Sequence, residues 1–201
     1  MGKGRLEAFS DGVLAIIITI MVLEMKVPHA GAHGEGGHGP GLADLLPIFP
    51  VFLSYLLSFI YLGIYWNNHH HMMHTVTRVT GGVLWANLHL LFWLSLVPFV
   101  TGWMGENDFA PVPTAVYGVV LLLSALAYYV LQTVIIRSQG KDSLLAKAVG
   151  SDWKGRLSPL LYVAAIVAAP FLPWVALALY VLVAVVWLVP DRRIERVIAP
   201  D

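Results

Sequence analysis

The stretch 157–190 runs for 34 residues without one charged side chain. A helix needs about 20 mostly apolar residues to cross the hydrocarbon core of a bilayer, so this stretch is too long for a single crossing. Pro170 and Pro173 interrupt it near the middle. We therefore expect a hairpin of two membrane helices, with Ser158 as the N-cap of the first and Pro159 at its first helical position.

The rest of the chain has the same character, because 58% of its 201 residues are hydrophobic and only 12% are charged. A soluble domain carries about twice that share of charged residues, and a soluble core of this size cannot bury so many apolar side chains. The formal net charge is zero, which speaks against a nucleic-acid binder. The sequence contains no cysteine, which excludes disulfides, iron–sulfur clusters and thiolate zinc sites. The composition predicts an integral membrane protein.

Apolar runs of membrane-spanning character occur at six places, so we expect an all-α integral membrane protein with six transmembrane helices per chain. Together they form a single domain, residues 1–201, with no soluble domain attached. The approximate predicted spans are 5–27, 45–67, 82–104, 113–136, 157–169 and 174–189.

Positive charges fall almost entirely on one side of this arrangement. Six spans place both termini on the same side as eleven of the twelve lysines and arginines, and Lys26 alone lies on the other side. Such an asymmetry is typical of cytoplasmic loops, so we expect a multi-pass protein of the cell membrane with both termini in the cytoplasm. The eleven residues are Lys3, Arg5, Arg78, Arg137, Lys141, Lys147, Lys154, Arg156, Arg192, Arg193 and Arg196.

The first predicted helix carries a carboxylate, Asp11, between Ser10 and Gly12. An Asp at the centre of a bilayer costs on the order of 3 kcal/mol on insertion scales, which makes it a functional candidate. At about 100° per residue, Asp11 lies roughly a third of a turn away from a nearly smooth aliphatic stripe. On composition alone, helix packing around a buried Asp11 network is the favoured interpretation. The stripe consists of Arg5, Phe9, Gly12, Ile16, Thr19, Ile20 and Leu23.

The same helix resembles the first-helix signature of the transmembrane protein 175 family of potassium channels. The resemblance rests on Arg5-x-x-x-Phe9-Ser10-Asp11-Gly12, followed by an aliphatic run that ends at Leu23-Glu24 and then Pro28. Looser matches are the segments WNNHH at 66–70, LWANL at 84–88 and PFVT at 98–101. Animal members look like two six-helix repeats in one chain, whereas this chain has one repeat, as bacterial members do.

The resemblance implies a homotetrameric, potassium-selective channel that lacks a re-entrant filter loop, and the sequence contains no TVGYG-like segment. In the family, the first helices line the pore and rings of bulky aliphatic residues form its narrowest part. Carried over, these rings are Ile16, Ile20 and Leu23, and Thr19 adds a hydroxyl on the same stripe. One helix per chain cannot enclose a pore, so the stripe requires an oligomer.

A second set of residues is expected to fix the pore helix and not to coordinate the ion. They belong to the first helix, the inner end of the second and the third helix, and they are Arg5, Phe9, Ser10, Asp11, Gly12, Trp66, His69, His70 and Asn87. An alternative stays open, in which a proton-coupled secondary transporter uses Asp11 and the histidines of the second helix as a proton relay. No nucleophile–base pair, phosphate-binding glycine loop or carboxylate dyad emerges, so we do not expect an enzyme.

Histidines gather at two places. His70 and His74, in the cluster His69–His74, are four residues apart, which is metal-ligand spacing; histidines at a wet membrane interface are the favoured interpretation. The glycine-rich loop 29–41 adds His29, His33 and His38 on the outer side, and its role stays open. We predict no metal and no cofactor. The expected partners are further copies of the chain, the lipid bilayer and permeant potassium ions.

Overall fold

The structure is a computed structural model that describes residues 2–27, 41–140, 142–149 and 153–188. Loop residues 29–40, Lys141, Arg192, Arg193, Arg196 and the last residue of the sixth predicted span lie outside these ranges. Among the described residues the chain is all-helical, which confirms the expected fold class at that level. The helices are α1 (Lys3–Ile20), η1 (Met21–Glu24), η2 (Leu42–Ile48), α2 (Phe49–His74), α3 (Gly81–Ser95), α4 (Val97–Glu106), α5 (Pro111–Gln139), α6 (Leu144–Val149), α7 (Trp153–Ala168) and α8 (Pro173–Leu188).

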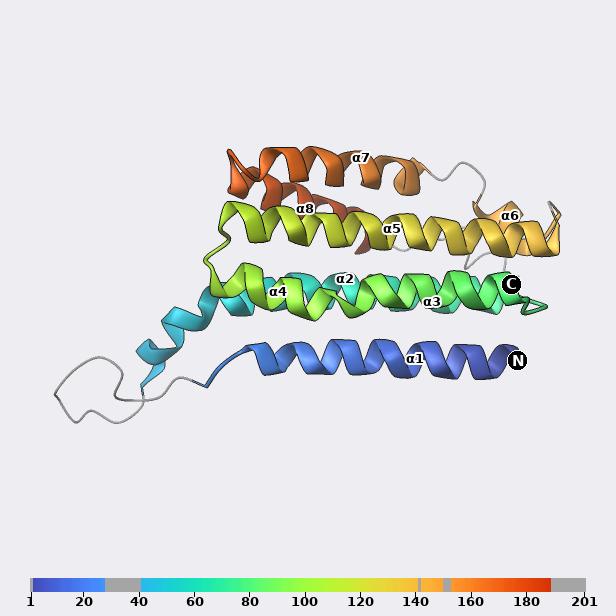
Figure 1. The fold of residues 1–201 in the computed structure, drawn as a ribbon, viewed down its shortest axis with the longest axis horizontal. Helices are drawn as coiled ribbons and strands as arrows, with labels where there is room; N and C mark the ends of the chain where they lie inside the picture. Colours follow the sequence, from blue (N-terminus) through green and yellow to red (C-terminus); the bar gives the residue numbers. More distant parts are fainter. Residues whose placement is uncertain (1, 28–40, 141, 150–152, 189–201) are drawn as a thin grey trace.

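The long helices run roughly parallel to one another in a layered bundle (Figure 1). Helix α1 lies at one edge, where it packs on α2 and α3. Helices α7 and α8 form the hairpin at the opposite edge, and α7 packs on α5. The first helix is therefore covered by its own chain on one side only.

Within the part of the chain that the structure describes, four segments are long and apolar enough to cross a membrane, namely Lys3–Glu24, Leu42–His74, Gly81–Glu106 and Pro111–Gln139. The expected hairpin is present as α7 and α8, but each arm has 16 residues. At a rise of 1.5 Å per residue, the described part of each arm is about 24 Å long, against a hydrocarbon core of about 30 Å. Four crossing helices are thus established by length, and six crossings per chain stay a prediction.

Two helix boundaries differ from the expected ones for identifiable reasons. Helix α2 continues to His74, seven residues beyond the predicted end at Asn67, because the polar residues that suggested a boundary include no glycine or proline to break the helix. The third span bends at Leu96, between α3 and α4. Pro98 follows directly and has no N–H to donate back into the preceding turn.

The prediction that Ser158 caps the first arm of the hairpin is wrong. Helix α7 begins at Trp153, so Ser158 and Pro159 lie inside it. The Ser158 hydroxyl donates to the carbonyl of Lys154 at 2.8 Å, one turn earlier. A serine bonded back in this way is compatible with a helix interior, and the sequence pattern alone does not separate this arrangement from a cap.

Gly105 sets the approach of α4 to α2. A Cβ at this position would lie 2.7 Å from the Cα of Val51 and would also meet the Oγ of Ser54. We expect Gly105→Ala to destabilise the protein by about 1–3 kcal/mol, because the backbone of α2 cannot rotate away. Thermal unfolding in detergent measures the effect. Gly81→Ala, at a helical glycine with open space around it, is the control, and equal melting temperatures for the two variants would contradict the expectation.

Candidate functional site

Helix α1 buries one narrow face against the bundle. The buried side chains of α1 recur every three or four residues, which is the spacing of a single helix face. Leu14 and Met21 are completely buried, and Ser10 is the one polar residue among them. The buried residues are Leu6, Ser10, Leu14, Ile17 and Met21. This spacing fixes the rotation of α1 and therefore decides which side chains point away from the bundle.

The opposite face of α1 is the stripe predicted from the sequence, and all seven of its residues are exposed in the single chain. Ile16 is 60% exposed and Leu23 is 77% exposed. A Cβ at Gly12 would meet nothing within 4 Å. No other described part of the chain covers this face, which is free to face an ion pathway, another copy of the chain or lipid.

The end of the stripe lies in the 3₁₀ segment η1, which follows α1 without a gap. In a 3₁₀ helix, side chains three residues apart are eclipsed. Leu23 is three residues after Ile20, so the tighter winding keeps Leu23 in line with Ile20. A regular α-helix would rotate Leu23 away from that line by about a sixth of a turn.

The Thr19 hydroxyl bonds back to its own helix. It lies 2.9 Å from the carbonyl oxygen of Ala15 and 3.0 Å from that of Ile16, and it donates its hydrogen to them. A hydroxyl oxygen that donates in this way still has lone pairs to accept with, and the Thr19 side chain is exposed. The back-bond therefore orients the oxygen without using its capacity as an acceptor.

A buried chain of hydrogen bonds joins α1, α2 and α3. The Asn87 amide donates to the Ser10 hydroxyl at 2.9 Å, and Ser10 donates in turn to the carbonyl of Leu6 at 2.9 Å. The other end of the Asn87 side chain, its carbonyl oxygen, lies 2.8 Å from Nε2 of His69. Since that oxygen only accepts, His69 carries its hydrogen on Nε2. The side chains of Ser10, His69 and Asn87 are all buried, so each holds the other two in place.

A second, partly exposed set of contacts lies on the flank of α1. The indole Nε1 of Trp66 donates to Oδ1 of Asp11 at 3.1 Å, and the Trp66 ring stacks on His70 with centroids 6.0 Å apart. His70 Nε2 lies 3.0 Å from Nε2 of His74. The ammonium of Lys3 donates to the carbonyl of His74 at 2.9 Å. These contacts fasten the first half of α1 to the polar end of α2.

The structure thus brings together most of the predicted network residues but not all of them. Phe9 and Gly12 lie on the exposed stripe, and Arg5 is exposed with no hydrogen bond or ion pair to the described residues. Between His69 and His70, the buried partner of Asn87 is His69. Among the described residues, no group of three or more potential ligands is arranged to hold a metal ion.

Sequence reasoning missed a cluster of hydroxyl groups in the core. The Ser58 hydroxyl lies 2.7 Å from that of Thr101 and 3.0 Å from that of Tyr117, which joins α2, α4 and α5. Each residue lies alone in a long apolar run, so only their shared position inside predicted spans could have flagged them.

An exposed ion pair that the sequence did not predict joins the segment after η1 to the end of α4. Lys26 lies 2.7 Å from a carboxylate oxygen of Glu106. The hydrogen bond and the charge of Glu106 raise the pKa of Lys26 above its ordinary value. Exposed pairs of this kind contribute little stability.

Comparisons with known proteins agree on one group. Residues 5–98 match the family described as endosomal/lysosomal potassium channel TMEM175. A protein of Chryseobacterium sp. (strain P1-3) named as a potassium channel is 56% identical over 196 residues, covering 98% of this chain and 97% of that protein. A potassium channel of Streptomyces collinus is 38% identical over 133 residues, which cover 64% of this chain and 62% of that protein. The crystal structure of a lysosomal potassium-selective channel TMEM175 homolog from Chamaesiphon minutus superposes with a TM-score of 0.79 at 29% identity, covering 94% of this chain and 97% of that one.

Proposed function

This chain belongs to the TMEM175 family, and from that membership we propose that it is a potassium channel of the cell membrane whose pore is lined by α1. Four identical chains assemble so that their α1 helices surround one axis. The exposed stripe of α1 faces that axis, and the buried face of α1 packs on α2 and α3 as described above.

The observation that carries this proposal is the uncovered face of α1 beside a partly exposed carboxylate. Ile16 and Leu23 alone would suit contact with lipid. Asp11 and its partner Trp66 would not suit contact with lipid. Trp66 is 44% exposed and so does not shield the Asp11 carboxylate completely, and a carboxylate beside lipid tails is costly. Neighbouring copies of the chain, with water between them, provide the cover and the hydration that this flank requires.

Ion selection follows from the chemistry of the aliphatic rings. Ile16, Ile20 and Leu23 offer no oxygen atom to replace lost water, so an ion crosses them partly dehydrated. Potassium holds its water less tightly than sodium and is therefore favoured. The same apolar rings close the pore when water leaves them. Asp11, Ser10, Asn87 and their partners hold the pore helix and do not coordinate the ion.

The proposed topology has six crossings with both termini in the cytoplasm. Its support is that the beginning of α1, the end of α2 and the end of α5 lie at the same end of the bundle (Figure 1), where Lys3, Arg78 and Arg137 are found. Neither a cofactor nor an enzymatic activity is part of the proposal. The proton-coupled transporter is not favoured, because the relatives are named as channels.

Ion flux from liposomes that contain the purified protein tests the function. A potassium gradient should dissipate without any coupled ion, and sodium should leak more slowly under matched conditions. Saturable flux that requires a second ion would support the transporter instead. Equal leak of both ions, or no leak of either, would contradict the proposed function.

Thr19→Val tests whether the hydroxyl on the stripe contributes to selection. The substitution keeps the shape and removes the oxygen, so we expect a lower preference for potassium over sodium in an intact oligomer. Reversal potentials in mixed potassium and sodium gradients measure the preference. Thr133→Val is the matched control, because the Thr133 hydroxyl also bonds back one turn, to Tyr129 at 2.8 Å, but on α5. Unchanged reversal potentials for Thr19→Val would show that its hydroxyl serves only the helix.

A further inference from the structure

An open cleft of about 680 Å³ lies between the last turns of α5 and the beginning of α7. Both helices contribute an arginine to it, Arg137 from the end of α5 and Arg156 from the first turn of α7. Apolar side chains, among them Leu126, Ile136 and Pro159, form part of its wall. The cleft therefore combines two positive charges with an apolar surface.

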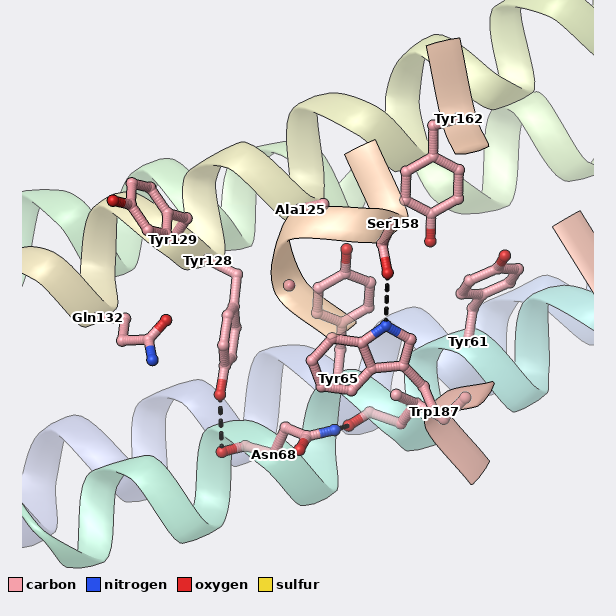
Figure 2. Close-up of a pocket in the computed structure, with 12 residues that line it drawn as sticks. Tyr61, Tyr65, Asn68, Ala125, Tyr128, Tyr129, Gln132, Ser158, Tyr162 and Trp187 are labelled. Atoms are coloured by element: carbon pink, nitrogen blue, oxygen red, sulfur yellow. Dashed lines mark hydrogen bonds between the residues drawn. The ribbon is translucent and has the colours of Figure 1, made fainter. Parts of the chain in front are cut away.

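The cleft shares part of its lining with a narrower recess of about 60 Å³ (Figure 2). Ala125, Tyr129 and Gln132 line both spaces. Rings of tyrosine and tryptophan surround the recess, and two of its polar groups are already bonded. Trp187 Nε1 donates to Ser158 Oγ at 2.8 Å, and the Tyr128 hydroxyl donates to the carbonyl of Asn68 at 3.2 Å. What the recess offers an occupant is largely ring and hydrocarbon surface.

The two arginines lack a compensating charge among the described residues. Both are exposed, and neither has a carboxylate within ion-pair distance in the part of the chain that the structure describes. The first turn of α7 carries Arg156 and no acidic residue. Positive charge is unfavourable at the N-terminus of a helix. Two like charges at one cleft indicate an anionic occupant.

We propose that this cleft binds an anionic phospholipid of the cytoplasmic leaflet. The phosphate lies between Arg137 and Arg156, whose guanidinium groups form charge-assisted hydrogen bonds with phosphate oxygens. One of its two acyl chains runs along Leu126 towards the tyrosines of the recess.

The position of the cleft favours a lipid over a free anion. Its arginines lie at the end of the bundle assigned to the cytoplasm, where anionic lipids attract basic residues. Its wall is open to the bilayer, since Leu126 is 43% exposed and Tyr129 is 64% exposed. A free phosphate would use the arginines only, whereas a phospholipid also covers the apolar wall.

Native mass spectrometry with thermal unfolding tests the proposal on the purified full-length protein in detergent. The added probe is phosphatidylglycerol, with phosphatidylcholine and inorganic phosphate in parallel. Phosphatidylglycerol should stay bound and raise the melting temperature, and the other two should do neither. In the double variant Arg137→Gln and Arg156→Gln, binding should fall by about tenfold or more, because each arginine supplies charge-assisted bonds. Arg78→Gln, at another exposed cytoplasmic arginine, is the matched control and should bind normally.

A second variant examines the apolar wall without altering any charge. Ala125→Phe fills the junction between cleft and recess, and it should weaken phosphatidylglycerol binding while both arginines remain. Equal binding of phosphatidylcholine, stabilisation by inorganic phosphate alone, or full binding by the glutamine double variant would overturn the proposal. Unaltered binding by Ala125→Phe would overturn the placement of the acyl chain. These measurements involve no ion flux, so their failure is distinct from failure of the channel function.

Discussion

Replacing Ile16 with asparagine is expected to raise conductance and to reduce the discrimination between potassium and sodium. Ile16 is the first bulky aliphatic residue of the stripe after Gly12, and it is 60% exposed in the single chain. An amide on each copy would keep this ring wet and would offer oxygen atoms to a dehydrated ion. The barrier that dehydration imposes would then fall for both ions, and more for sodium, which holds its water more tightly.

Single-channel currents and reversal potentials in planar bilayers measure both effects of Ile16→Asn. The matched control is Val167→Asn, which makes the same kind of change at a site on α7 that is 64% exposed. The control should leave conductance and selectivity at their original values. If Ile16→Asn also changes neither quantity, the pore is lined by a different face.

Asn87→Leu is expected to cause the largest loss of stability in the polar cluster. It removes the donor to Ser10 and the acceptor for His69, both of which are buried. The His69 N–H is then left unpaired, which costs about 1–3 kcal/mol. Ser10 keeps its bond to the carbonyl of Leu6 and loses one hydrogen bond worth about 1 kcal/mol, so the total is roughly 2–4 kcal/mol. Thermal unfolding of the detergent-solubilised protein, combined with size-exclusion chromatography, measures folding and assembly.

Asp11→Asn serves as the milder comparison for Asn87→Leu. The new amide oxygen can still accept from Trp66, so the loss is confined to the charge assistance of one partly exposed bond, about 1 kcal/mol. We expect some loss of oligomer stability with potassium flux retained. Normal assembly together with abolished proton-coupled transport would instead support the transporter alternative. A melting temperature for Asn87→Leu equal to the original would show that the buried chain of hydrogen bonds does not hold α1.

The helical fold could be predicted from the sequence wherever composition alone decides it. Charge-free runs indicated the helices, and Pro170 with Pro173 indicated the turn of the hairpin. The ends of the helices were harder to predict, because a polar segment shows where a span leaves the bilayer and not where its helix ends. Helix α2 therefore continues through a polar segment to His74. The bend at Leu96 accompanies Pro98, and a proline inside an apolar run does not by itself show whether the span ends there or only bends.

The candidate site could also be predicted only in part. Helical periodicity alone grouped Ile16, Thr19 and Leu23 on one face, because that grouping needs only the geometry of a single helix. The partner of Asn87 depends on how α2 is rotated against α3. His69 and His70 are adjacent in sequence but point in different directions, so only the structure distinguishes the buried one from the exposed one.

The change from α-helix to 3₁₀ winding after Ile20 has a consequence for how the proposed pore would shut. Four residues of α-helix rise about 6 Å, and three residues of 3₁₀ helix also rise about 6 Å. In the proposed tetramer, rings of Ile16, Ile20 and Leu23 would therefore be evenly spaced along about 12 Å of the axis, in spite of their uneven spacing in the sequence. A water molecule is about 2.8 Å across, so closure breaks a column of roughly four waters. Because the interruption would be distributed over three rings, a rotamer change in one ring would not refill it, and the proposed shut state would tolerate side-chain motion.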